Sequence, residues 1–266
     1  MLRNVFELVL TCVKFKRILW ATTIFELKKK YAGTFLGYSW LVLYPLLFLS
    51  VYLFLWLVVF KTRFPGYSEV DYVVFVFSGL VPYLFVSEVA TTAVVSIRQN
   101  MHLIKNVMIP ISLVPIRVVG MALASMLVGL LLLLFLSGLN GTLAYKLFYL
   151  IFFLIFTLLF ALGLALFLAP LGVLIPDASN IVNLVVLLMM FLSPIAFKIE
   201  MVPSYLKYTI LFNPITYIME PFRAFIISSH ALDWRLLLGS FLIAVATFLL
   251  GVLFFSRFKK YMVDYE

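Results

Sequence analysis

Glu88 is the charged residue most able to do chemistry, because it lies inside a long apolar stretch of the sequence. Burying a charged side chain at the centre of a membrane costs about 2.5 to 3.5 kcal/mol, so such a group is expected to face protein or water. Glu88 can line a polar path, or it can pair with a neighbouring group or stay protonated. A single isolated acid does not separate these interpretations, and both stay open.

Sequence patterns typical of enzymes are absent. No glycine is followed by lysine, so the phosphate-binding Walker loop is missing and the chain is not expected to hydrolyse ATP by that route. His102 and His230 are expected on opposite sides of a membrane, which excludes a shared metal site or a paired acid and base. The single cysteine, Cys12, has no neighbouring ligand set. We therefore expect no catalytic residue, metal or cofactor in this chain.

Membrane-spanning helices must position these residues. Hydrophobic residues make up 65% of the 266-residue chain and charged residues only 12%, which leaves too little polar surface for a soluble domain of this size. The apolar blocks are continuous, whereas the strands of an outer-membrane barrel alternate apolar and polar residues. The net charge of +9 does not indicate nucleic acid binding, because the basic residues cluster at the ends of apolar blocks. The sequence predicts an all-α integral membrane protein with one domain, residues 1–266.

About six membrane spans are expected, with both ends of the chain in the cytoplasm. About 13 of the 20 lysine and arginine residues fall on the segments assigned to the cytoplasm, as the positive-inside rule requires. Roughly 20 apolar residues are needed to cross the hydrocarbon core. The expected spans are residues 36–60, 72–97, 112–139, a fourth ending near 175, a fifth rising to 197, and 236–256.

Two segments outside these spans have patterns of their own. Residues 1–35 mix recurring apolar positions with lysines and arginines, which favours an amphipathic helix in the membrane interface over a solvated basic tail. They show no signal-peptide pattern, so we expect the mature chain to begin at Met1. Prolines interrupt residues 198–230, whose apolar pieces are too short to cross a membrane. This region is interpreted as an exterior re-entrant helical hairpin.

Three short motifs, in this order, resemble those of ABC-transporter permeases of the polysaccharide-export group. The first is Leu27–Pro45, which reads LKKKYAGTFLGYSWLVLYP, and the second is Asn100–Pro115. The turn at Pro176 and Asp177 departs from the family pattern, because relatives often have a basic residue before the acid. The third motif consists of Ser193, Pro194, Asn213, Pro214, Tyr217, Glu220 and Arg223.

The resemblance implies the fold of a type-2 ABC exporter permease and a homodimer resting on two ATP-binding subunits, which would carry the ATP and Mg. It implies export of a lipid-linked polysaccharide, with O antigen as the first expectation, across the bacterial cytoplasmic (inner) membrane. Teichoic acid, capsule, drug and lipid exporters remain alternatives within the same class. A membrane-embedded glycan-processing enzyme and a structural scaffold remain alternatives from other classes.

The resemblance also assigns residues to three roles. Coupling to the ATP-binding subunits falls on segment 98–111 and the turn after the fourth span, through Asn100, His102, Leu103, Ile104, Lys105 and Asp177. The entrance for the lipid linker is formed by Lys28, Lys29, Lys30 and Tyr31. The conduit or its exterior gate, in region 198–230 and nearby spans, includes Tyr38, Trp40, Glu88, Ser193, Pro194, Asn213, Pro214, Tyr217 and Arg223.

Overall fold

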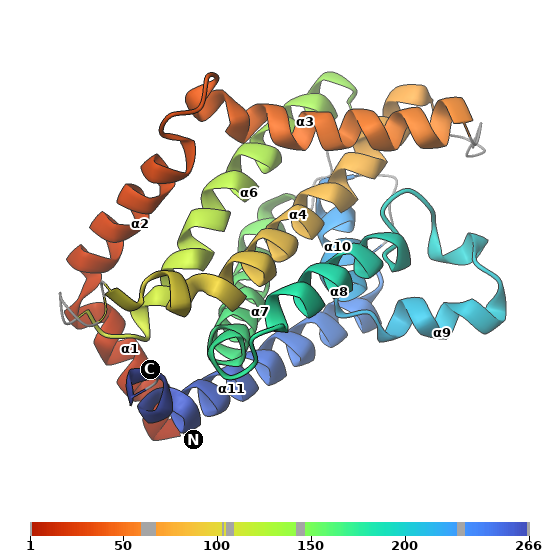
Figure 1. The fold of residues 1–266 in the computed structure, drawn as a ribbon. Helices are drawn as coiled ribbons and strands as arrows, with labels where there is room; N and C mark the ends of the chain where they lie inside the picture. The colour runs from red at the N-terminus through yellow and green to blue at the C-terminus, as the bar shows by residue number, and fades with distance from the viewer. Residues whose placement is uncertain are drawn as a thin grey trace.

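The computed structural model describes residues 2–59, 68–102, 104, 109–141, 147–227 and 232–264, and regular structure in these ranges is helical (Figure 1). This confirms the expected all-α membrane fold. The helices are α1 (Leu2–Lys14), α2 (Lys16–Tyr31), α3 (Trp40–Leu53), α4 (Glu69–Gln99), α6 (Leu113–Leu139), α7 (Leu147–Leu174), α8 (Ala178–Leu192), α9 (Ser204–Phe212), α10 (Pro214–Ile226) and α11 (Trp234–Asp264). A 3₁₀ turn (Gly37–Ser39) precedes α3, a π-helical turn (Phe54–Val59) follows it, and another 3₁₀ turn (Ile199–Met201) precedes α9.

Five helical segments in the described part of the chain are long and apolar enough to cross a membrane. The shortest has 23 residues, which at about 1.5 Å per residue exceeds the roughly 30 Å of the hydrocarbon core. The protein is therefore a multi-pass membrane protein. The five segments are Gly37–Val59, Glu69–Gln99, Leu113–Leu139, Leu147–Leu174 and Trp234–Lys259.

The expected fifth span is shorter than the sequence analysis proposed. Helix α8 has 15 residues and ends at Leu192, so it covers only about 22 Å. Ser193, which follows it, is extended, because the ring of the next residue, Pro194, disfavours helical geometry at the position before it. The expectation of a continuous rise to Phe197 is therefore wrong.

Helix α4 lies at the centre of the bundle and packs against α6, α7, α8 and α10 (Figure 1). Its side chains Phe75, Phe77 and Val89 are fully buried. Helices α7 and α11 pack backbone to backbone, because a side chain at Gly251 would collide with the carbonyl of Gly163. Small residues at a helix crossing allow such close approach in membrane proteins. This part of the molecule is consequently dense and apolar.

The N-terminal region, expected as one amphipathic interface helix over residues 1–35, instead forms two helices, α1 and α2, with a break at Phe15. Helix α1 packs against the end of α11, where Val5 and Leu8 contact the cluster that contains Phe255 and Met262. Helix α2 packs along α6. The two termini lie beside each other at one end of the bundle (Figure 1).

The region after α8 contains two short helices, α9 and α10, as expected for a helical hairpin. Asn213 separates them, and its side-chain oxygen accepts a hydrogen bond from the backbone nitrogen of Ile215 at 2.9 Å. Pro214 occupies the first turn of α10, where its missing N–H has no helical partner to lose. Helix α10 is buried against α4, α7 and α11, whereas much of α9 is exposed. Its exterior, re-entrant placement stays a prediction.

Candidate functional site

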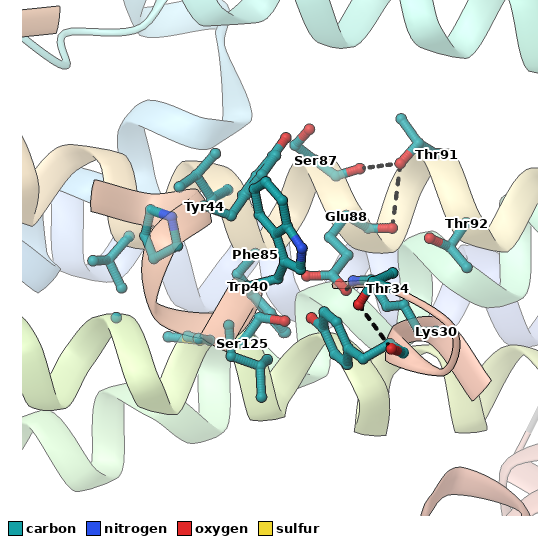
Figure 2. A pocket seen from close by; sticks show the side chains of 17 residues that line it. Lys30, Thr34, Trp40, Tyr44, Phe85, Ser87, Glu88, Thr91, Thr92 and Ser125 are labelled. Carbon is teal, nitrogen blue, oxygen red and sulfur yellow. Dashed lines mark hydrogen bonds and ion pairs between the residues drawn. The ribbon is translucent and has the colours of Figure 1, made fainter. Parts of the chain in front are cut away.

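A cavity of about 470 Å³ lies between the C-terminal end of α2, the start of α3, and the facing sides of α4 and α6. It brings together four residues that the sequence analysis assigned to two different roles: Lys30, Tyr31, Trp40 and Glu88. Figure 2 shows Lys30, Trp40 and Glu88 converging on this space from three elements. The expected entrance and conduit residues thus share one site.

Glu88 lines this cavity and also pairs with a base. The Nζ of Lys30 lies 2.5 Å from the Oε1 of Glu88, and the side chains are 39% and 22% exposed. Burial alone lowers the pKa of the Lys30 ammonium, but the charge and hydrogen bond of Glu88 outweigh that effect and raise it. The charged form of Lys30 is therefore favoured beside this acid.

Hydroxyl groups and aromatic rings make up much of the rest of the cavity wall. Thr91 donates to the carbonyl of Ser87 at 2.9 Å, and Thr34 donates to the carbonyl of Tyr31 at 2.8 Å (Figure 2). Each hydroxyl oxygen keeps lone pairs that can accept a hydrogen bond from a ligand. The wall also includes Trp40, Tyr44, Phe85, Thr92 and Ser125.

Several of these wall residues were not predicted from the sequence, although their spacing carried a signal. Leu84, Ser87, Glu88, Thr91 and Thr92 recur at intervals of three and four, so they share one face of α4. An intramembrane acid flanked on its own face by hydroxyls indicates a polar cavity. The wall residues of α6 had no comparable mark, because Ser125 stands among apolar residues.

Two other residues expected at the entrance, Lys28 and Lys29, and one expected in the conduit or gate, Tyr38, lie outside the cavity wall. Lys28 and Lys29 are exposed on the last turn of α2. Tyr38 is 54% exposed, and its ring centroid lies 5.9 Å from that of Tyr31. The last turn of α2 thus carries two exposed lysine charges that have no ion pair among the described residues.

A second, apolar cavity of about 780 Å³ lies between α3 with its π-helical turn and the end of α8. Tyr44 lines both cavities, so the polar cavity adjoins the apolar one. Ser193, expected in the gate, contributes to this second wall. The remaining lining residues are Leu47, Phe48, Val51, Tyr52, Leu55, Trp56, Met190, Phe191, Ile195, Ala196 and Phe197.

Two of the expected gate residues, Pro194 and Arg223, belong to a buried network around the Arg223 guanidinium. This guanidinium is fully buried and donates to the carbonyls of Pro194 and Ile195 at 3.0 and 3.1 Å. It also pairs with Glu220 at 2.6 Å and lies 3.7 Å above the ring centroid of Phe75. Arg223 therefore fastens α10, the segment after α8 and α4 to one another.

The neighbouring gate residues also make packing contacts. The amide of Asn213 donates to the hydroxyl of Ser193 at 2.8 Å. Tyr217 packs on α11, where a side chain added at Gly239 would meet its ring. Ser193 lines the apolar cavity, and its partner Asn213 is buried.

The expected coupling residues gather at the end of α4 and at the turn between α7 and α8. Asn100 follows α4 and accepts a hydrogen bond from Arg117 of α6 at 2.7 Å. Arg98, the last basic residue of α4, donates to the carbonyls of Val173 and Pro176, each at 3.3 Å. The two expected coupling sites are thus joined, and Arg98 brings a basic group to the turn that lacks one in sequence.

The expected coupling residues differ in exposure. His102 and Asp177 are exposed. Ile104 is buried in a cluster with Ile97, Ile111 and Val114, so it anchors the segment instead of facing a partner. The expectations on Leu103, Lys105 and His230 fall outside the described residues.

Comparison with known proteins agrees with this geometry. Residues 17–227 match the ABC-2 type transporter family. Two proteins from Klebsiella pneumoniae, each called O-antigen export system permease protein RfbA, are 25% and 24% identical to the chain over 213 and 237 residues. The aligned parts cover 79% and 88% of this chain, and 75% and 89% of those relatives.

A protein of the same name from Myxococcus xanthus is 26% identical over 202 residues, which are 75% of this chain and 76% of that relative. These findings confirm the family resemblance that the sequence motifs indicated. The family match covers more than half of the chain, so this protein is a membrane transport subunit of the ABC-2 type transporter family.

Proposed function

We propose that this chain is the membrane subunit of an ATP-driven exporter that moves a lipid-linked polysaccharide, with O antigen as the first candidate. Two copies would form the conduit, and two ATP-binding subunits would bind and hydrolyse ATP with Mg. The family match and the names of the relatives support this proposal. The excess of basic residues on one side favours a bacterial cytoplasmic membrane with both termini inside.

The observation that carries the substrate class is the composition of the polar cavity. Aromatic rings of Tyr31, Trp40 and Tyr44 stand beside threonine and serine hydroxyls and a lysine. Flat aromatic faces and hydroxyl acceptors suit sugar rings, and exposed lysines suit an anionic phosphate linker. The adjoining apolar cavity, which shares Tyr44, suits a hydrocarbon chain.

The coupling geometry supports a mechanism in which the partner subunits push on segment 98–111. The segment is anchored by Ile104, and Arg98 ties it to the α7–α8 turn that ends in Asp177. A displacement at this end would tilt α4, whose middle carries Glu88 at the polar cavity. Closure of the ATP-binding subunits would thereby change the shape of the cavity.

The first test is assembly. We would co-express the chain with its candidate ATP-binding subunit, purify the complex through a tag on this chain, and measure ATP hydrolysis in lipid. The proposal predicts a stoichiometric, active complex. Failure to recover an ATP-binding partner in several detergents and lipids would contradict it, and a complex without transport of lipid-linked glycan would contradict the substrate class.

The second test addresses the cavity through Trp40→Ala, with Trp234→Ala as the matched control on the exposed start of α11. Loss of an aromatic contact of about 1 kcal/mol corresponds to roughly a fivefold loss of affinity. Glycan export should fall with Trp40→Ala and stay at the parent level with Trp234→Ala. Equal export by both variants at equal expression would remove Trp40 from the site.

A third test uses the difference between Lys30, which pairs with Glu88, and its neighbours Lys28 and Lys29. Lys28 and Lys29 are free of the ion pair that engages Lys30. Replacing both by glutamine should reduce export if they attract an anionic linker, without changing the Lys30–Glu88 pair. Unchanged export at normal expression would refute the entrance role of these two lysines.

A further inference from the structure

A buried arginine joins three helices next to the expected coupling segment. Arg117, on α6, is 6% exposed, and its Nη2 donates to the Oδ1 of Asn100 at 2.7 Å. The amide nitrogen of Asn100 in turn donates to the carbonyl of Ser96 at 2.7 Å. The end of α4 is thus fixed both to its own last turn and to α6.

The same nitrogen of Arg117 faces α2. It lies 3.7 Å from the Oε1 of Glu26, and the two side chains are 7% and 16% exposed. The Nε of Arg117 is buried and has no hydrogen-bond partner among the described residues. Arg117 is therefore attracted to Glu26 of α2 by charge without a hydrogen bond between them. Its Nε–H has no acceptor among the described residues.

Helix α2 approaches α6 closely at this level. Gly120 lies one turn beyond Arg117, and a Cβ placed there would be 3.1 Å from the methyl carbon of Thr23 on α2. The hydroxyl of Thr23 is occupied by the carbonyl of Leu19 at 2.7 Å, so this contact is a packing contact without cross-helix hydrogen bonding. Arg117 and Glu26 supply the charged link between these two faces.

Glu26 also lies one helical turn before Lys30. Residues four apart lie on the same face of a helix, so a rotation or shift of α2 at Glu26 moves Lys30 as well. Lys30 pairs with Glu88 at 2.5 Å in the wall of the polar cavity. Helix α2 is therefore held at two adjacent points: at the coupling end by Arg117, and at the cavity by Glu88.

We propose that Arg117 is a positioning residue that transmits movement of the coupling segment at Asn100 to Glu26 and, through α2, to the cavity wall at Lys30. The proposal rests on the ATP-driven function proposed above. The contact is suited to this task because an arginine has five N–H donors, and the one on Nε has no acceptor in the part of the chain that the structure describes. The guanidinium can shift between Asn100 and Glu26 while its buried charge stays close to a carboxylate.

The alternative role for Glu26 is static neutralisation of the buried Arg117 charge. The two roles predict different results when the carboxylate that faces Arg117 is moved from α2 to the end of α4. Glu26→Gln removes the charge on α2, and Asn100→Asp combined with Glu26→Gln returns a carboxylate to Arg117 from α4. If Glu26 only neutralises Arg117, the double variant should restore the parent behaviour. If Glu26 links Arg117 to α2, the double variant should not restore it.

The measurement uses the complete complex with its ATP-binding subunits, reconstituted in lipid, in a Cys12→Ser background. One reporter is Ala21→Cys on α2, and the other is Gln99→Cys at the end of α4, since both positions are exposed. The rate of maleimide labelling is compared with and without ATP. Thermal unfolding of each variant reports whether the fold is retained.

In the parent we expect ATP to change labelling at both reporters, by about fivefold or more for a coupling in the usual range. Glu26→Gln should abolish the response at Ala21→Cys and keep that at Gln99→Cys, and adding Asn100→Asp should not restore it. A persistent α2 response in Glu26→Gln, or its recovery in the double variant, would overturn the proposal. Absence of an ATP response at both parent reporters would overturn the ATP-driven function itself, and the relay with it.

Discussion

The two most buried arginines of the described chain, Arg223 and Arg117, are held in opposite ways. Arg223 is fully buried, donates hydrogen bonds of 3.0 to 3.2 Å to α4 and to the segment after α8, and has its ion pair with Glu220 of its own helix at 2.6 Å. Arg117 makes one short hydrogen bond, has its ion pair at 3.7 Å, and leaves Nε without a partner among the described residues. The Arg223 guanidinium is held by several hydrogen bonds, whereas the Arg117 guanidinium keeps a donor without an acceptor among the described residues.

This difference shows how the same residue type can fix one end of a helical bundle and leave the other adjustable. Removing a partner from a saturated buried charge leaves polar groups without compensation, which is strongly destabilising. A loosely satisfied charge loses less and can change partners. We therefore expect the Arg223 region to determine stability and the Arg117 region to determine movement.

The largest expected effect is that of Arg223→Met. The carbonyls of Pro194 and Ile195 lose their donor and the buried Glu220 loses its guanidinium, so stability should fall by about 3 to 5 kcal/mol. Scanning fluorimetry in detergent and the yield of monodisperse protein measure this loss. Arg235→Met, at an exposed arginine, is the matched control and should unfold at the parent temperature. Equal unfolding temperatures for the two variants would contradict the stabilising role of the Arg223 hydrogen bonds.

A matched pair of glycines sharpens the comparison. A methyl group at Gly79 would lie 2.8 Å from the Nη2 of Arg223 and 3.2 Å from the backbone of Ile195. Gly79→Ala should therefore cost about 1 to 3 kcal/mol through overpacking. Gly120→Ala meets the Thr23 side chain at 3.1 Å, where a small helix shift gives room, and alanine gains about 1 kcal/mol in helix propensity. Its unfolding temperature should stay close to that of the parent, and a larger loss than for Gly79→Ala would reverse the ranking.

The acids paired with the two arginines should rank in the same order. Glu220→Gln weakens a short charged hydrogen bond in a buried site and should cost about 1 to 3 kcal/mol. Glu26→Gln loses a charge at 3.7 Å without losing a hydrogen bond, so its cost should be about 1 kcal/mol or less. Chemical or thermal unfolding of both variants gives the comparison. A larger cost for Glu26→Gln would show that Arg117 is as rigidly held as Arg223.

The smallest effect concerns the half-exposed Lys30–Glu88 pair, for which solvent screening limits the contribution to under about 1 kcal/mol. The folded-state pKa of Lys30 is raised above its ordinary value of 10.5, so the stabilisation is complete below pH 10.5 and is lost as pH rises through the higher folded-state pKa. The difference in unfolding temperature between the parent and Lys30→Met should be constant from neutral pH to about pH 10 and shrink above that. A difference that already shrinks between pH 7 and 9 would contradict the upward shift.

The spans and the polar cavity were predictable to different extents. Long apolar runs revealed the five long helical segments, four of which hold more than 20 consecutive uncharged residues while Glu88 interrupts the second, because length and hydropathy suffice for that prediction. The span predicted at α8 was too long. The sequence stays apolar past Leu192, and the helix ends there because of Pro194. Glu88 was recognised as an unusual charge, but its partner Lys30 is 58 residues away and depends on how α2 crosses α4.

The sequence by itself determined the membrane class, the approximate spans, the family motifs and the residues around which a site forms. These follow from hydropathy, chain length and the sparse charges, which are local properties. Only the tertiary structure decided that Arg223 is a buried staple, that Ile104 is an anchor, and that Arg117 stands between Asn100 and Glu26. These roles depend on which faces of the helices pack together. The periodicity of a single helix does not specify that packing, so it does not specify the partner of a buried charge either.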